Sequence, residues 1–175
     1  MEEQQPDTKK LIVNYGLILG IVSILYSLTI YLTDSYKDPH WSVGILGFII
    51  LPVIIYLSIK TYKENNNGFL TLSNALKIGI GVALVGGILS ALWNITLTSV
   101  IEPEYTQQVL AAQKENALKD SPDLTEEQID QVFAMTEKLQ SPFISFAFGI
   151  IGSLFFGFIF SLIIGLIMQK KEELY

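Results

Sequence analysis

Five side chains of types that coordinate divalent cations lie beside long uncharged runs of the sequence: Asp34, Asp38, His40, Glu102 and Glu104. Carboxylate oxygens together with one imidazole nitrogen can bind such an ion. The same residue types also populate any short loop in water, because they are rarely buried. We therefore expect a solvated surface at these positions rather than a metal site, and metal binding is the alternative.

Other residue types that carry chemistry are missing from the chain. It contains no cysteine, and all eleven of its basic residues are lysines. Thiol nucleophiles and cysteine-ligated metals are therefore excluded, and so is the planar guanidinium fork that recognises phosphates. The isoelectric point of about 4.7 argues against nucleic acid as a partner. We expect no catalytic residue and no cofactor.

The elements that must position the polar residues are four apolar runs, at 11–32, 41–59, 78–101 and 143–168. Crossing about 30 Å of hydrocarbon takes roughly 20 helical residues, and a helix satisfies its own backbone polar groups. We predict an all-α fold, a four-helix transmembrane bundle that makes residues 1–175 a single membrane domain. Tyrosine is the only ionisable residue in the runs. Proton relays and intramembrane proteolysis both need carboxylates, histidines or bound metal within the spans, so the sequence argues against both. We expect the protein not to be an enzyme.

The lysines predict the orientation of the bundle. Seven of them flank the runs on one side: Lys9, Lys10, Lys60, Lys63, Lys77, Lys170 and Lys171. Four lie on the other side: Lys37, Lys114, Lys119 and Lys138. Because the cytoplasmic side carries the excess of positive charge, we predict that both chain ends are cytoplasmic, in a bacterial inner membrane. Tyr31, Tyr36 and Trp41 then form an aromatic belt at the outer boundary.

Residues 102–141 form the one long segment between the runs. They carry nine acidic residues and three lysines, which accounts for the whole net charge of −6. Pro103 suits the first turn of a helix, the segment 120–123 is rich in turn residues, and Thr125 with Gln128 can form a capping box. An apolar stripe then runs from Ile129 to Leu139. We predict an extracytoplasmic helical hairpin, either as a solvated connection or as a docking surface for a basic partner or cations.

Small residues recur at every fourth position of the last two spans. The packing positions this predicts are Gly79, Ala83, Gly87, Ala91, Ser145, Gly149, Ser153, Gly157, Ser161 and Gly165. Helices in lipid associate through close contact, which small residues allow. Consecutive antiparallel spans joined by a hairpin favour packing within one chain. The alternative is a homodimer seam along one of the two spans.

The segment Gly68-Phe69-Leu70-Thr71-Leu72, followed by Ala75, Lys77 and Gly79, resembles the entry to the third span in a bacterial membrane family, domain of unknown function family 4199. The resemblance extends through Pro103, the segment 125–128, Ser141-Pro142 and the glycine-rich last span. It implies no activity and no catalytic residue. From the residues themselves, Asn67-Gly68 predicts a turn, and Ser73 predicts the cap of the helix that follows.

These features favour a structural or accessory membrane protein. Its partners would be the lipid bilayer and either a second copy of the chain or another membrane protein, with no nucleic acid. A transporter or pore component for small solutes or ions is the first alternative, although the spans carry no charge. An outer-face protein that binds divalent cations is the second.

Overall fold

The computed structural model describes residues 7–120, 125–138 and 141–170. The helices are α1 (Thr8–Leu32), α2 (Trp41–Asn65), α3 (Leu72–Thr96), α4 (Tyr105–Asp120), α5 (Glu126–Lys138) and α6 (Pro142–Met168), and a π-helical segment η1 (Leu97–Ile101) continues α3. Helices make up nearly all of the described chain, so the predicted all-α fold is confirmed. Of the expected turn at 120–123, Asp120 is the last residue of α4, while 121–123 and Leu139 of the predicted stripe lie outside the described residues.

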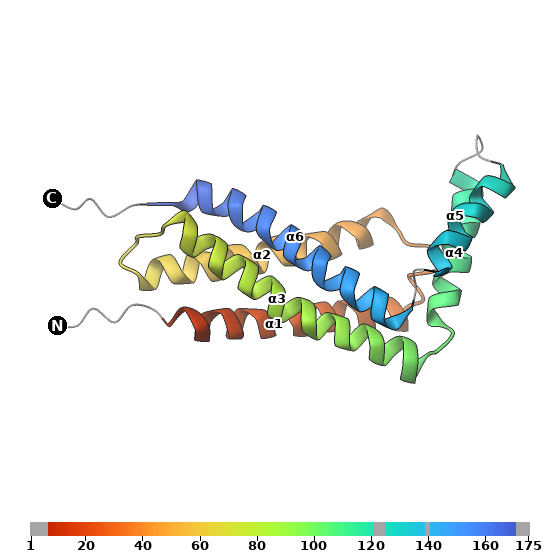
Figure 1. Cartoon of the computed structure of the whole chain (residues 1–175), viewed down its shortest axis with the longest axis horizontal. Helices are drawn as coiled ribbons and strands as arrows, with labels where there is room; N and C mark the ends of the chain where they lie inside the picture. The colour runs from red at the N-terminus through yellow and green to blue at the C-terminus, as the bar shows by residue number, and fades with distance from the viewer. Residues whose placement is uncertain (1–6, 121–124, 139–140, 171–175) are drawn as a thin grey trace.

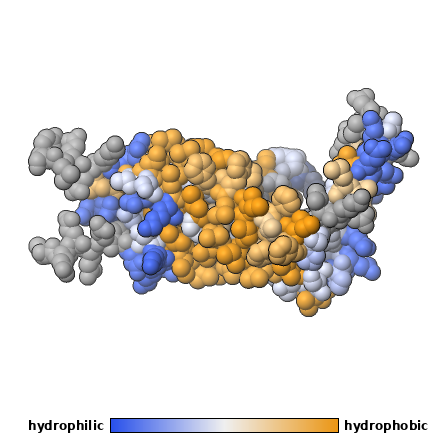
Figure 2. Space-filling view, in the orientation of Figure 1, coloured by the Kyte–Doolittle hydropathy of each residue, from blue (hydrophilic) through white to orange (hydrophobic). Residues whose placement is uncertain are grey.

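Four of the helices are long and apolar enough to cross a membrane: α1, α2, α3 with η1, and α6. They lie side by side, while α4 and α5 stand across one end of the bundle (Figure 1). Apolar side chains cover the middle of the bundle between two hydrophilic ends (Figure 2). The helices run past the predicted ranges 41–59 and 78–101, because a helix continues through the lysines at the bilayer boundary while an uncharged run stops there.

Side-chain caps define several helix starts. Thr125 and Gln128 form the expected capping box at α5, in which Gln128 N donates to Thr125 Oγ1 at 3.3 Å and Thr125 N donates to Gln128 Oε1 at 2.9 Å. Ser141 caps α6 ahead of Pro142. The prediction for α3 was wrong by two residues: Thr71, not Ser73, accepts from the backbone N of Asn74 at 3.2 Å. Thr71 has the extended backbone of a cap residue, so the helix begins at Leu72.

That turn is at Asn67-Gly68, as predicted. Both residues have positive φ, 53° for Asn67 and 82° for Gly68, a region that asparagine and glycine tolerate best. The turn ends α2 and directs Leu70 inward, where it is fully buried. Leu70 and Lys170 exchange two backbone hydrogen bonds of 2.9 Å. The loop between α2 and α3 is therefore joined directly to the C-terminal end of α6.

α3 lies at the centre of the bundle and packs most extensively against α6 and α1. A Cβ atom added at Gly79 would collide with the Ser161 side chain, and one added at Gly157 would collide with Ala83. Further along the same seam, Gly165 faces Ala75. Such close approach is how helices gain packing energy in lipid.

The opposite side of α3 is built in the same way. Gly16 and Gly20 of α1 lie against Val85 and Leu89 of α3, and Gly86 of α3 receives Leu19. Around these contacts lies a core of fully buried residues: Ile55, Ile59, Ile78 and Val82. Because α3 is close to a neighbour on two sides, its small residues set the spacing of the whole bundle.

Replacing Gly79 with alanine should lower the free energy of unfolding by about 1–3 kcal/mol, the usual cost of overpacking, because Ser161 occupies the space of the new methyl group. Gly152→Ala is the matched control, since nothing lies within 4 Å of a Cβ at that position. Unfolding by sodium dodecyl sulfate in mixed micelles measures the free energy of unfolding of both variants. Equal stability of the two variants would contradict the close contact at Gly79.

Candidate functional site

The five candidate metal ligands do not come together. Asp34 pairs with Lys37 at 2.9 Å. His40 caps α2, with its Nδ1 at 2.9 Å from Ser42 Oγ. Glu102 accepts from Tyr31 Oη at 3.4 Å, and Asp38 and Glu104 are exposed. Across the described residues, no group of three or more His, Cys, Asp or Glu side chains is arranged to hold a metal ion.

The local contacts of this loop determine its electrostatics. The hydrogen bond from Lys37 lowers the pKa of the Asp34 carboxyl below its ordinary value. The same contact raises the pKa of Lys37, while burial raises the pKa of the Tyr36 phenol. Asp34 and Lys37 thus remain charged partners of each other over a wide pH range.

Three tyrosines form a joint between the bundle and the hairpin. The ring of Tyr105, at the start of α4, packs edge-on against Tyr36 and Tyr31 with centroid distances of 5.0 and 5.7 Å. Tyr36 Oη donates to Gln108 Oε1 at 2.7 Å, and Asn116 Nδ2 donates to the carbonyl of Lys37 at 3.2 Å. We refer to Tyr31, Tyr36, Tyr105 and Gln108 as the tyrosine joint. It attaches α4 to the loop between α1 and α2.

The two hairpin helices pack on each other through a small interface. Ile129 of α5 is buried against α4, and Lys114 forms an ion pair with Asp130 at 2.5 Å. Val132 and Met135 lie one helical turn apart on α5 and are 62% and 70% exposed. These two apolar side chains lie outside the candidate spans. We call them the α5 ridge.

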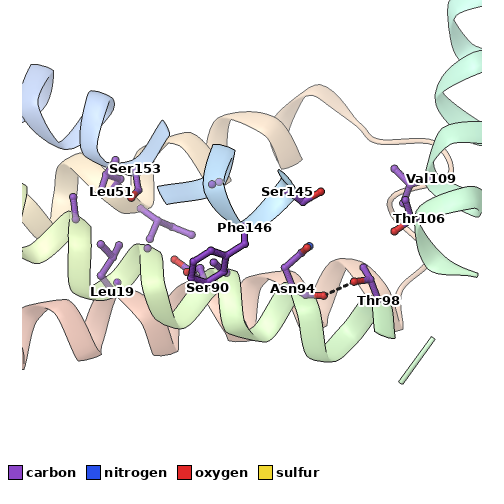
Figure 3. Close-up of a pocket in the computed structure, with 18 of the residues that line it drawn as sticks. Leu19, Leu51, Ser90, Asn94, Thr98, Thr106, Val109, Ser145, Phe146 and Ser153 are labelled. Carbon is purple, nitrogen blue, oxygen red and sulfur yellow. Dashed lines mark hydrogen bonds between the residues drawn. The ribbon is translucent and has the colours of Figure 1, made fainter. Parts of the chain in front are cut away.

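A cavity of about 530 Å³ lies in the half of the bundle next to the hairpin. Residues from α1, α2, α3, α4, η1 and α6 line it, and Figure 3 shows their side chains. Its polar groups include Ser90, Asn94, Thr98, Thr106, Ser145 and Ser153. Leu19, Leu51 and Phe146 are among its apolar walls. None of the described residues lining it is charged.

The predicted packing residues divide between closed contact and this cavity. Gly79, Ala83, Gly157, Ser161 and Gly165 lie in the close α3–α6 seam. Gly87 meets the Ser153 side chain, and both also border the cavity. Ala91, Ser145 and Gly149 line the cavity, and a Cβ at Gly149 would have nothing within 4 Å. The seam is therefore open at the hairpin end.

The asparagines of the first and third spans are both exposed, at opposite ends of the bundle. Asn94 lines the cavity, and Thr98 Oγ1 donates to its backbone carbonyl at 2.8 Å (Figure 3). Asn14 is exposed on α1, near the lysine-rich end of the bundle. The cavity around Asn94 was not predicted from the sequence.

Four apolar helices in one bundle, with polar and charged residues at its two ends, define a multi-pass helical membrane protein. The chain belongs to the family described as protein of unknown function, DUF4199, whose model matches residues 14–170. This confirms the resemblance found in the sequence. No curated protein and no solved structure matches the chain.

Removing the Tyr36 hydroxyl should loosen the hairpin. Tyr36→Phe deletes one hydrogen bond, worth about 0.5–1.5 kcal/mol, from the tyrosine joint. Spin labels at Gln113 of α4 and Leu46 of α2 should then report a broader distance distribution. Tyr56→Phe is the control, because Tyr56 is exposed on α2 and lies outside the joint. An unchanged distribution in Tyr36→Phe would show that the joint does not hold α4.

Proposed function

We propose that the protein is a non-catalytic accessory component of the bacterial inner membrane that uses its hairpin to bind a basic segment of another membrane protein. The observation that carries the proposal is the α5 ridge. Val132 and Met135 expose apolar surface on a helix that is not one of the candidate membrane-spanning helices. Exposed apolar residues within a polar surface mark interaction sites.

The charge of the hairpin favours a basic partner. Residues 102–141 carry the net charge of −6 of the chain, and Glu127 is exposed on α5, the helix that carries the ridge. Two copies of this surface would repel each other, since like charges in contact disfavour association. A positively charged amphipathic segment can pack its apolar side against Val132 and Met135 and pair its charges with exposed carboxylates of the hairpin.

The distribution of lysines supports a hairpin outside the cytoplasm. The start of α1, the last turn of α6 and the loop between α2 and α3 lie at the end of the bundle away from α4 and α5 (Figure 1). Lys10, Lys60, Lys63, Lys77 and Lys170 belong to that end. Positive charge beside span ends is retained in the cytoplasm, so both chain termini are cytoplasmic in this proposal.

A non-catalytic role also agrees with the polar groups near the tyrosine joint. Asp34 is paired with Lys37, His40 serves as a helix cap, and Glu102 accepts hydrogen bonds from Tyr31 and Gln108. An acid or base catalyst needs a side chain aimed at a substrate. These groups are instead engaged in local structure.

Photocrosslinking tests the partner. A benzoylphenylalanine at position 132 should capture a second membrane protein through a segment rich in lysine or arginine, and the yield should fall as salt rises. The matched control is the same residue at position 113, which is exposed on α4 away from the ridge. Equal products from both positions, or a product that joins two copies of this chain, would contradict the proposed partner.

Cysteine labelling tests the orientation. The chain has no native cysteine, so Gln113→Cys and Asn67→Cys each provide a single reactive group at opposite ends of the bundle. In intact spheroplasts a membrane-impermeant maleimide should label position 113 and reach position 67 only after lysis. The reverse pattern would overturn the orientation while leaving the fold unchanged.

A further inference from the structure

We propose that the cavity beneath the hairpin binds an uncharged single-chain amphiphile. Its polar head would lie near Asn94, Ser145 and Thr106, and its hydrocarbon tail would extend toward Leu19 and Leu51. This site is separate from the α5 ridge, and its occupant differs from the partner proposed for that surface.

The dimensions of the cavity suit such a molecule. Its volume of about 530 Å³ falls within the roughly 300–1,000 Å³ of small-molecule sites. On α3 its lining extends from Ala83 to Asn94 and continues to Thr98 of η1. At 1.5 Å per residue this is about 22 Å along the helix axis. A cavity of that length and modest volume is elongated, as a hydrocarbon chain is.

Polarity changes along the cavity. Toward the middle of the bundle its lining includes Leu19, Leu51 and Ala83. At the hairpin end it includes Asn94, Thr98 of η1 and Thr106 of α4, and Ser145 enters from α6 (Figure 3). An amphiphile has the same gradient, with its tail toward the bilayer centre and its head toward the interface.

The hydrogen-bonding groups indicate a neutral head. Thr98 and Ser153 already donate to backbone carbonyls. The side-chain amide of Asn94 is exposed and forms no hydrogen bond with the other described residues, so it can both donate to and accept from a ligand. The described lining contains no lysine or carboxylate, and an unpaired charge at membrane depth is costly. Hydroxyl or ester heads therefore fit, and phosphate or carboxylate heads do not.

The cavity is open because two constraints separate its walls. Toward the lysine-rich end, Gly157 and Gly165 hold α6 in close contact with α3, whereas Gly149 has no atom within 4 Å of its Cβ position. At the other end the tyrosine joint attaches α4 to the loop between α1 and α2. Thr106 and Val109 of α4 thus border the cavity at its hairpin end.

The test uses monoolein, a neutral single-chain amphiphile, titrated onto the full-length protein in nanodiscs and detected by native mass spectrometry. Gly149→Leu places a side chain in the open space and should weaken binding by about tenfold or more. Gly152→Leu is the matched control: it lies on the same helix with equal room for a side chain but does not line the cavity. It should bind within about twofold of the wild type.

Two further arms separate the cavity from unspecific lipid contact. Asn94→Leu replaces the amide with an apolar side chain of similar size, so it should also weaken monoolein binding. Oleate and lysophosphatidylglycerol, which have the same kind of tail with a charged head, should not compete. Thermal unfolding of each variant verifies the fold, and Asn94→Leu decides the outcome if Gly149→Leu does not fold.

The proposal is overturned if Gly149→Leu and Asn94→Leu, both folded, bind monoolein as the wild type does. It is also overturned if oleate displaces monoolein with equal affinity, or if Gly152→Leu loses binding to the same extent as Gly149→Leu. These results would leave the crosslinking test of the α5 ridge unaffected, because that test does not involve the cavity.

Discussion

The rest of the structure depends on the close contact between α3 and α6. Gly79 lies against Ser161, Gly157 against Ala83 and Gly165 against Ala75, so the two backbones approach as near as side chains allow. Inside a bilayer no hydrophobic effect drives helices together, and this kind of packing is the main attraction available. α3 uses its opposite side for α1 in the same way, and the remaining helices adapt to this three-helix core.

The cavity follows from where that contact ends. The small-residue repeat of α6 continues through Gly149 and Ser145, but α3 is no longer close enough to meet them. The tyrosine joint and the hydrogen bond from Asn116 attach α4 to the loop between α1 and α2, beside the opening. An amphiphile-sized space is thus built from two rigid attachments with a gap between them, and it needs no specialised fold.

Much of this architecture follows from local chemistry that a sequence displays. Span length and lack of charge determine the four long helices, and the reciprocal hydrogen bonds of Thr125 and Gln128 determine the start of α5. The cavity could not be predicted, because Gly149 and Gly157 belong to the same four-residue repeat and differ only in what faces them. Tyr36 fits an aromatic belt as well as it fits a joint, since both use one apolar ring and one hydroxyl. Only its burial beside Gln108 distinguishes the two roles.

The paired backbone hydrogen bonds between Leu70 and Lys170 have a consequence for the synthesis of the chain. Lys63 Nζ also donates to the carbonyl of Met168, at 2.8 Å, so the loop between α2 and α3 is fastened by residues made about a hundred positions later. During translation the hydrogen bonds between Leu70 and Lys170 cannot form until the last helix has been inserted. Closing the loop therefore requires the last helix to be in place, and a chain truncated before that helix would leave the backbone groups of Leu70 without their partners on Lys170.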